Sequence, residues 1–136
     1  MKKLLPILLL TLICFTLKAK DEPSQRFRTK AVAYLDKEVK NPEYGPWKDH
    51  SVLIVSDLEN RRITVYNSKK DIYDIISVGD SRRDDDNNLS LELGALDGDG
   101  KRCTITLVNR QKAGEIQLYF EYNNMAWVYA ITQLID

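Results

Sequence analysis

The residues best suited to chemistry lie together in one short stretch, where His50 is flanked by Asp49 and Ser51. Serine, histidine and aspartate can act as a nucleophile, its general base and the carboxylate that orients that base. Adjacent residues of an extended segment point in opposite directions, however, and the chain has no Gly-x-Ser-x-Gly nucleophile motif. We therefore interpret His50 as a loop or strand-edge residue. Because the chain has no second histidine, we also expect no zinc cluster and no other cofactor.

Two acidic motifs could attract a cation or a basic partner. Asp97-Gly98-Asp99-Gly100 resembles part of a calcium loop, but the twelfth position counted from Asp97 is Val108, where such a loop needs glutamate. A hairpin turn accounts for both glycines, so we expect no metal there. The second motif is Arg82-Arg83-Asp84-Asp85-Asp86, within a long polar stretch at 79–88 that we expect to be a loop. Because long loops often carry function, it is our candidate partner loop.

Aromatic residues supply a further lead, because several of them fall on expected strands. If those strands close into a barrel, the inner aromatic side chains line either a packed core or a ligand cavity, and their bulk favours a filled interior. The candidate ligand-lining or core-lining residues are Phe120, Trp127, Tyr129 and Tyr73. A hydrolytic enzyme stays open as an alternative if carboxylates converge in three dimensions. The carboxylates considered are Asp57, Asp74, Asp97 and Glu121.

The elements that must position these residues are short strands that follow one another in hairpins. Apolar–polar alternation interrupted by turn clusters is typical of all-β domains. It predicts seven strands, at 51–56, 62–67, 71–78, 89–96, 101–109, 115–122 and 125–132, with a short loop at 110–114. Residues 26–39 fit a helical stripe or a strand, and we favour a strand because it would let the meander close. Residues 41–46 form an irregular link to Trp47, which we expect to plug one end of the core.

The last two hairpins can be assigned a register, because directly paired residues share one face of a sheet. A two-residue type I′ turn at Asn123-Asn124 pairs Phe120 with Trp127 and makes one face entirely apolar or aromatic. A three-residue loop ending at a left-handed Gly100 pairs Ala95 with Cys103, which directs Cys103 toward the core.

The earlier hairpins follow the same logic. A loop at 58–60 with a left-handed Asn60 pairs Val55 with Ile63, and a loop at 68–70 then pairs Ile63 with Ile75. Consecutive hairpins without a crossover predict an antiparallel up-and-down meander of seven to eight strands. Such a meander forms either a small calycin-like barrel or a two-layer sandwich.

The first 19 residues have the pattern of a secretory signal peptide. Lys2 and Lys3 precede an uncharged apolar run at 4–17, and a small residue, Ala19, ends the segment. We therefore expect a leader at 1–19, a single β domain at 20–136, and export to the periplasm or the cell exterior. A lipid anchor at Cys14 is not favoured, because the lipoprotein route wants a small residue where the chain has Ile13.

Removal of the leader changes both the charge and the cysteine content. Lys+Arg falls from 20 to 17 against 20 Asp+Glu, so the mature chain carries a formal charge of −3 and has no electrostatic drive toward nucleic acid. Cys103 is then the one remaining cysteine, which excludes an intramolecular disulfide. The apolar run at 4–17 is too short to span a bilayer as a helix, and we expect no transmembrane segment in the mature chain.

Four strings of the chain are distinctive: Val-Leu-Ile-Val-Ser-Asp-Leu-Glu-Asn-Arg-Arg-Ile-Thr-Val-Tyr (52–66), Tyr73-Asp-Ile-Ile, Leu96-Asp-Gly-Asp-Gly-Lys-Arg-Cys and Trp127-Val-Tyr. Together they resemble a group of small uncharacterised exported proteins of Bacteroides-type bacteria. The resemblance covers residues 47–132 and consists of strand and turn patterns. It implies a Gram-negative setting, but no activity and no functional residues.

Together these features predict an exported, non-enzymatic β domain that acts by binding. We rank a protein partner slightly above a small ligand carried by the barrel. A cavity of several hundred Å³ lined by the inner aromatic residues would reverse that order.

Overall fold

The computed structural model describes residues 24–57, 59–110 and 114–134. Within these residues, every regular secondary-structure element is a β-strand. The strands are β1 (Ser24–Asp36), β2 (Lys48–Asp49), β3 (Leu53–Asp57), β4 (Arg62–Tyr66), β5 (Lys70–Arg83), β6 (Leu89–Leu96), β7 (Arg102–Arg110), β8 (Glu115–Glu121) and β9 (Met125–Leu134). The expected leader, 1–19, and the loop residues 111–113 lie outside the described residues. No helix among the described residues is long and apolar enough to cross a membrane.

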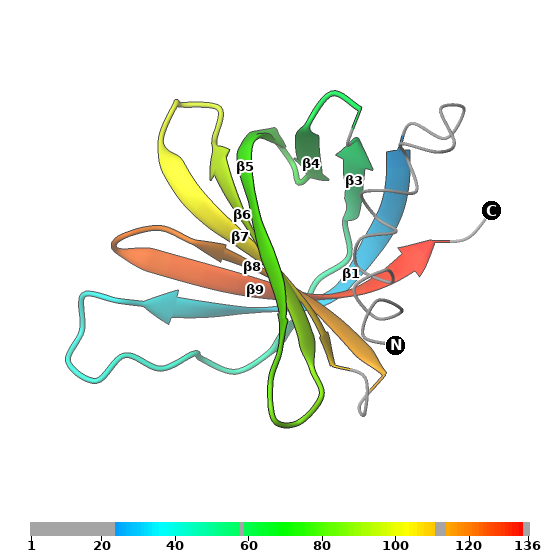
Figure 1. Ribbon diagram of the computed structural model, residues 1–136. Helices are drawn as coiled ribbons and strands as arrows, with labels where there is room; N and C mark the ends of the chain where they lie inside the picture. The colour runs from blue at the N-terminus through cyan, green and yellow to red at the C-terminus, as the bar shows by residue number, and fades with distance from the viewer. Residues whose placement is uncertain (1–23, 58, 111–113, 135–136) are drawn as a thin grey trace.

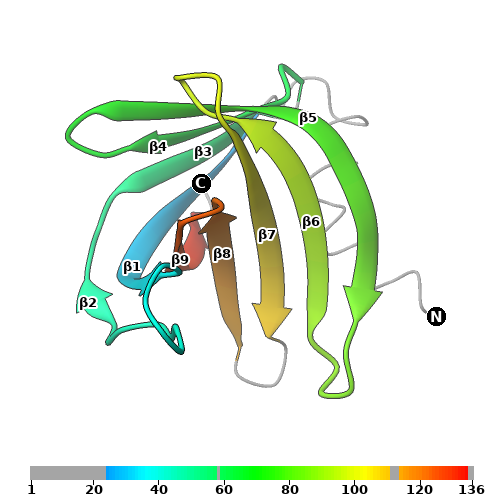
Figure 2. The same cartoon turned by 90° about the vertical axis from the view of Figure 1, so that its left-hand side faces the viewer.

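The strands form one antiparallel sheet in the order β2-β1-β3-β4-β5-β6-β7-β8-β9, and β1 also pairs with β9. That last pairing closes eight strands into a barrel, with the short β2 as an extra strand (Figure 1, Figure 2). The predicted all-β meander is therefore confirmed, and the barrel is confirmed over the sandwich. Closure removes the exposed sheet edges of the eight barrel strands.

Residues 24–36 decide the closure, because they form the strand that joins the two ends of the meander. β1 pairs with β3 through Ser24–Arg28 and with β9 through Arg26–Asp36, which confirms the strand prediction for this segment. Its register with β9 shifts between Thr29 and Ala31, so Lys30 is an extra residue at a bulge. Phe27 and Val32, one on each side of the bulge, are both buried in the core.

The barrel interior is filled by side chains. Ile105 and Phe120 have no exposed surface, and Tyr73 and Tyr129 are each 5 % exposed in the same hydrophobic cluster. Fully burying one such side chain stabilises the fold by about 1.5–3 kcal/mol. Cys103 belongs to this cluster, as its pairing with Ala95 predicted.

The last two hairpins have the predicted registers, with Phe120 opposite Trp127 and Ala95 opposite Cys103, and Gly100 is left-handed. The predicted type I′ turn is wrong, however. Such a turn needs positive φ at both central residues, and neither Asn123 nor Asn124 has a positive φ. Contacts with the end of β1 shape this turn instead. The backbone N–H of Lys37 donates to the Asn124 carbonyl (3.1 Å), and its ammonium donates to the Tyr122 carbonyl (2.7 Å).

The predicted register of the β3–β4 hairpin is wrong by one residue. Arg61, not Asn60, takes the left-handed conformation, because Asp57 holds the Asn60 backbone N–H and side-chain amide inside the turn. Ile63 therefore pairs with Ser56 rather than with Val55. A slip of one residue exchanges the two faces of a strand. The chain consequently buries Ile54 (1 % exposed) and leaves Leu53 and Val55 half-buried on the other face.

The predicted register of the β4–β5 hairpin is wrong by two residues, which preserves the faces. Ile63 pairs with Tyr73 rather than with Ile75, and the connection runs through 67–69 because Tyr66 already pairs with Lys70. The turn is closed by the Asn67 side-chain amide, which donates to Asp71 Oδ2 at 2.9 Å. Both Tyr73 and Ile75 still enter the core.

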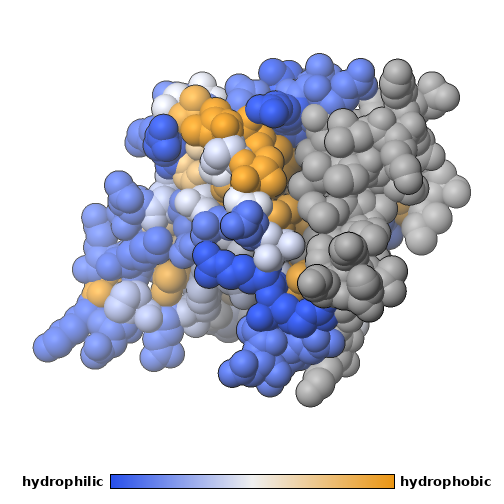
Figure 3. All heavy atoms as spheres, viewed as in Figure 1, coloured by the Kyte–Doolittle hydropathy of each residue, from blue (hydrophilic) through white to orange (hydrophobic). Residues whose placement is uncertain are grey.

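β5 is longer than predicted, and the expected loop at 79–88 is correspondingly shorter. Two β-bulges bend the strand, which continues through Arg83 and leaves Ile76 and Val78 exposed. Its hairpin with β6 projects from the barrel in Figure 2. In the view of Figure 3, hydrophobic residues gather over β4 and β5, and hydrophilic residues cover most of the remaining described surface.

Trp47 does not plug the core, since its side chain is 47 % exposed. The segment between β1 and β2 instead folds back along β1, where the Gly45 N–H donates to the Tyr34 carbonyl at 2.8 Å. Tyr44 then reaches the outer face of β8 and packs edge-on against Tyr119, with ring centroids 6.0 Å apart.

Candidate functional site

A cleft opens at one end of the barrel, beside the β4–β5 and β6–β7 turns, and we call it the mouth cleft. Its volume is about 330 Å³. The first turn and the start of β5 contribute Lys69, Lys70, Asp71, Ile72 and Tyr73; the second turn contributes Asp97, Gly98 and Asp99; the β8–β9 hairpin contributes Tyr122 and Trp127. Three hairpins that are distant in the sequence therefore build one concave surface.

One wall of the mouth cleft is an aromatic stack that follows from the β8–β9 register. Phe120 faces Trp127 across the two strands, with ring centroids 5.6 Å apart and planes 9° apart. Tyr122 also stacks on Trp127, at 5.7 Å and 26°. Tyr73 leans on Phe120 from β5 at 4.8 Å. Neighbouring rings therefore already stack against Trp127, which keeps its orientation fixed.

Asp97 ties the β6–β7 turn to this aromatic wall. Its Oδ1 accepts hydrogen bonds from the backbone N–H groups of Asp99 and Lys101, both at 2.9 Å, and its Oδ2 accepts one from the Tyr122 hydroxyl at 2.8 Å. Desolvation alone would raise the pKa of Asp97, but these hydrogen bonds lower it more, so the net shift is downward. The carboxylate therefore serves the turn itself, in agreement with the hairpin interpretation of the glycine pair.

The tyrosine hydroxyls around the mouth cleft stay protonated. Burial is the main cause that raises the pKa of Tyr73, and the nearby Asp71 carboxylate adds to it. Burial also raises the pKa of Tyr122, with the hydrogen bond to Asp97 as the next cause. The pKa of Tyr129 is raised by burial as well. The cleft thus offers neutral hydroxyl groups, which can both donate and accept hydrogen bonds.

Trp127 adds a donor without an acceptor. Its indole Nε1 is buried and has no hydrogen-bond partner among the described residues. Burial raises the pKa of Tyr129, and the nearby Trp127 indole acts in the opposite direction, although no hydrogen bond joins the two groups. A buried donor without a partner costs about 1–3 kcal/mol, which an acceptor supplied by a ligand or a water would offset.

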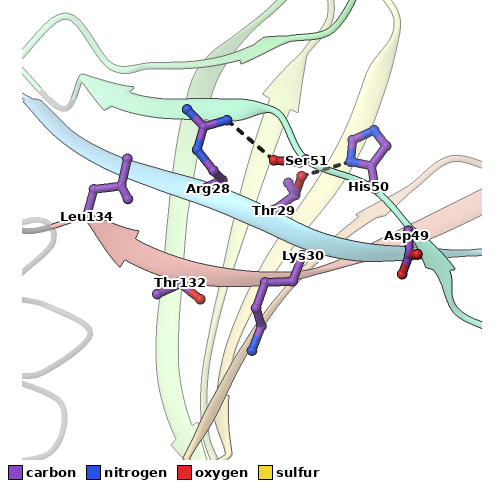
Figure 4. A pocket seen from close by; sticks show the side chains of 8 residues that line it. All are labelled: Arg28, Thr29, Lys30, Asp49, His50, Ser51, Thr132 and Leu134. Carbon is purple, nitrogen blue, oxygen red and sulfur yellow. Dashed lines mark hydrogen bonds between the residues drawn. The ribbon is translucent and has the colours of Figure 1, made fainter.

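His50 lies next to the barrel core and not at a catalytic triad. Its ring stacks on Tyr129, with centroids 5.2 Å apart, and its Nδ1 lies 2.8 Å from Thr29 Oγ1. In Figure 4 the His50 ring and the Asp49 carboxylate lie on opposite sides of the segment, and Ser51 interacts with Arg28 instead (3.5 Å).

Thr29 and His50 form a hydroxyl–imidazole pair, but not a nucleophilic one. Thr29 is 1 % exposed, and its Oγ1 also accepts the backbone N–H of Val52 at 2.8 Å. The hydroxyl donates to His50 Nδ1 or accepts from it, according to the tautomer of the ring. The pair bridges β1 to the β2–β3 connection. Outside it lies an open groove of about 660 Å³ between β1, β9 and that connection (Figure 4).

The carboxylates considered for hydrolysis each have a local partner. Asp57 binds Asn60 within its turn, Asp74 pairs with Arg62 (3.1 Å), and Glu121 lies 3.6 Å from the Lys37 ammonium. Within the described residues, no three His, Cys, Asp or Glu side chains come together in a way that could hold a metal ion.

The candidate partner loop divides into two parts. Arg82 and Arg83 are strand residues of β5, paired with Ser90 and Leu89, so their assignment to a loop is wrong. The three aspartates Asp84-Asp85-Asp86 do lie in the turn. Asp84 closes that turn by accepting hydrogen bonds from the Asn88 backbone and side chain, which lower its pKa.

Of the predicted aromatic residues, Tyr73 and Trp127 line the mouth cleft, whereas Phe120 and Tyr129 pack behind it. Sequence reasoning missed Asp71, because the β4–β5 register was displaced by two residues. It also missed the joining of the β4–β5 and β6–β7 turns, for which the chain carries no local signal.

Comparison of the chain with protein-family models, curated proteins and solved structures found no match.

Proposed function

We propose that this domain binds a small molecule in the mouth cleft and does not catalyse a reaction. The observation that carries the proposal is the cleft of about 330 Å³ lined by Tyr73, Tyr122 and Trp127. Small-molecule sites are typically concave and combine aromatic or apolar walls with placed polar groups. Here the two turns supply the polar groups, through Lys69, Lys70, Asp71, Asp97 and Asp99. A cleft of this kind favours a small ligand over a protein partner, which reverses the order expected from the sequence.

Binding is favoured over catalysis by the engagement of the reactive groups. The Thr29 hydroxyl beside His50 is only 1 % exposed and also accepts the Val52 backbone N–H, and the Asp97 carboxylate has three donors from its own hairpin and Tyr122. A nucleophile, a general acid or a general base needs access to the substrate. We further propose that binding takes place outside the cytoplasm, on the strength of the leader pattern at 1–19.

The test is a ligand screen of the purified protein by nuclear magnetic resonance, with the indole N–H signals of the two tryptophans as reporters. Trp127 lines the cleft, whereas Trp47 is exposed on the segment between β1 and β2 and serves as an internal control. A ligand of the mouth cleft should move the Trp127 signal and leave the Trp47 signal in place.

Two tyrosine variants make the screen specific. Tyr73→Phe removes a hydroxyl from the cleft, whereas Tyr66→Phe removes an exposed one from β4. Ligand affinity should fall in the first variant only. Equal affinity in both variants, or turnover of an ester, peptide or glycoside by the purified protein, would count against the proposal.

A further inference from the structure

We infer that the ligand of the mouth cleft is a neutral carbohydrate of one or two rings. The inference rests on the proposed function and names the chemical class of its ligand. Three properties of the cleft support it: the near balance of its charges, its neutral hydrogen-bonding groups, and the stacking of Phe120 and Tyr122 on the Trp127 ring.

The charges that line the cleft nearly cancel. Lys69 and Lys70 stand against Asp71, Asp97 and Asp99. The Asp97 carboxylate already accepts three hydrogen bonds from within the protein. The lining therefore carries a formal charge of −1, and Asp97 is the aspartate that is engaged within the protein. The other two aspartates balance the two lysines, so a charged ligand would lose its hydration without a strong ion pair in return.

The cleft also offers a ligand a neutral hydrogen-bonding group. The Tyr73 hydroxyl lines the cleft and makes no hydrogen bond within the described residues. Trp127 Nε1 also lacks an acceptor, but this nitrogen is buried, so the Tyr73 hydroxyl is the group that a ligand in the cleft reaches. A tyrosine hydroxyl can donate or accept, and sugar hydroxyls do both, so a sugar can bond it in either sense.

The aromatic rings argue against flat or lipid-like ligands. Phe120 and Tyr122 already stack on Trp127, so a planar heterocycle would find its ring face largely occupied. The interior below is filled by Phe120 and Ile105, which leaves no room for an acyl chain. Tyr34 is not one of the lining residues, but it is paired with Trp127 across β1 and β9 and is 49 % exposed. The Lys48 ammonium lies 5.9 Å from the centroid of the Tyr34 ring, and the exposed part of that ring can pack against the apolar face of a sugar.

The experiment titrates the protein with glucose, N-acetylglucosamine and lactose. Choline, acetate and indole serve as cationic, anionic and flat aromatic probes. The Trp127 indole N–H signal is followed with Trp47 as the internal control. At least one sugar should move the Trp127 signal in a saturable way, and the three other probes should not.

The variants are Tyr73→Phe in the cleft, Tyr34→Ala on β1 and Tyr66→Phe as the matched control on β4. The first two should weaken the sugar about five- to tenfold, the effect of one lost hydrogen bond or ring contact, while Tyr66→Phe leaves the affinity unchanged. Tyr34 is exposed, so its variant reports on binding even if Tyr73→Phe alters packing.

Saturable binding of choline, acetate or indole at Trp127 without any sugar response would overturn the carbohydrate inference and leave the proposed function in place. If none of the six probes moves the Trp127 signal, the carbohydrate inference fails. The wider ligand screen then decides the proposed function separately.

Discussion

Thr29 is the residue at which a single lost hydroxyl should have the clearest effect on stability. Its Oγ1 accepts the Val52 backbone N–H at 2.8 Å and lies 2.8 Å from His50 Nδ1, so one oxygen joins β1 to the β2–β3 connection. Thr29→Val preserves the volume and the branched shape of the side chain but removes both hydrogen bonds. Packing of the neighbouring core is therefore nearly unchanged, and the effect isolates the hydroxyl.

The expected magnitude follows from the burial of the group. Thr29 is 1 % exposed, so the Val52 N–H is left without an acceptor in a place that water reaches poorly. A buried donor left unsatisfied costs about 1–3 kcal/mol. His50 is half-buried and can turn its Nδ1 toward water, so it adds little. We expect a loss of about 2 kcal/mol in the free energy of unfolding, a decrease of roughly 1–2 M in the urea midpoint.

The assay is equilibrium urea unfolding followed by tryptophan fluorescence. Thr64→Val is the matched control, because Thr64 is also buried (8 % exposed) but makes no hydrogen bond among the described residues. It should change stability by less than about 0.5 kcal/mol. Thr29→Ser retains the hydroxyl and should recover most of the loss. Equal midpoints for Thr29→Val and Thr64→Val would refute the reasoning, because the bridging oxygen would then contribute nothing.

Three further outcomes are expected. Hydrogen bonds lower the pKa of Asp97 below its ordinary value of 3.8, so the stability that they add is present above pH 3.8 and is lost as the pH falls through the lower pKa of the folded state. Asp97→Asn should therefore flatten the dependence of the melting temperature on pH at the acid end, and a profile parallel to that of the wild type would contradict this. Ile54→Ala should cost about 2–5 kcal/mol in chemical denaturation and Val55→Ala clearly less, whereas the reverse order would restore the register predicted from the sequence. Burial raises the pKa of the Cys103 thiol, so Ellman's reagent should label Cys103 only in denaturant, and rapid labelling of folded protein would mean that the site opens.

The fold could be predicted where local signals were sufficient. In the β8–β9 hairpin, alternating residues specify the apolar face, and a two-residue connection then allows one register, which places Phe120 opposite Trp127. The β6–β7 hairpin is similar, because Gly100 is the residue best able to take the left-handed position. The same reasoning failed at β3–β4. There Asn60 was the expected left-handed residue, but its backbone N–H and side-chain amide donate to the Asp57 carboxylate, and Arg61 takes the left-handed conformation instead.

The mouth cleft could be predicted only in part. Tyr73 and Trp127 were found because inner-face aromatic residues can be read from alternation. Asp71 was missed because its place depends on the β4–β5 register, and that register is set by the Asn67–Asp71 side-chain bond. His50 was correctly separated from Asp49, but its stacking on Tyr129 was not foreseen, because the contact joins positions 79 residues apart.

By itself, the sequence determined that this is an all-β chain of antiparallel hairpins with one apolar face, because alternation and turn residues act over a few positions. It also established the face on which Cys103, Phe120 and Trp127 lie. The tertiary structure decided that the meander closes through β1 and that distant turns meet around one cleft. Closure depends on the twist and register accumulated over all eight strands, and no short stretch of sequence contains that sum.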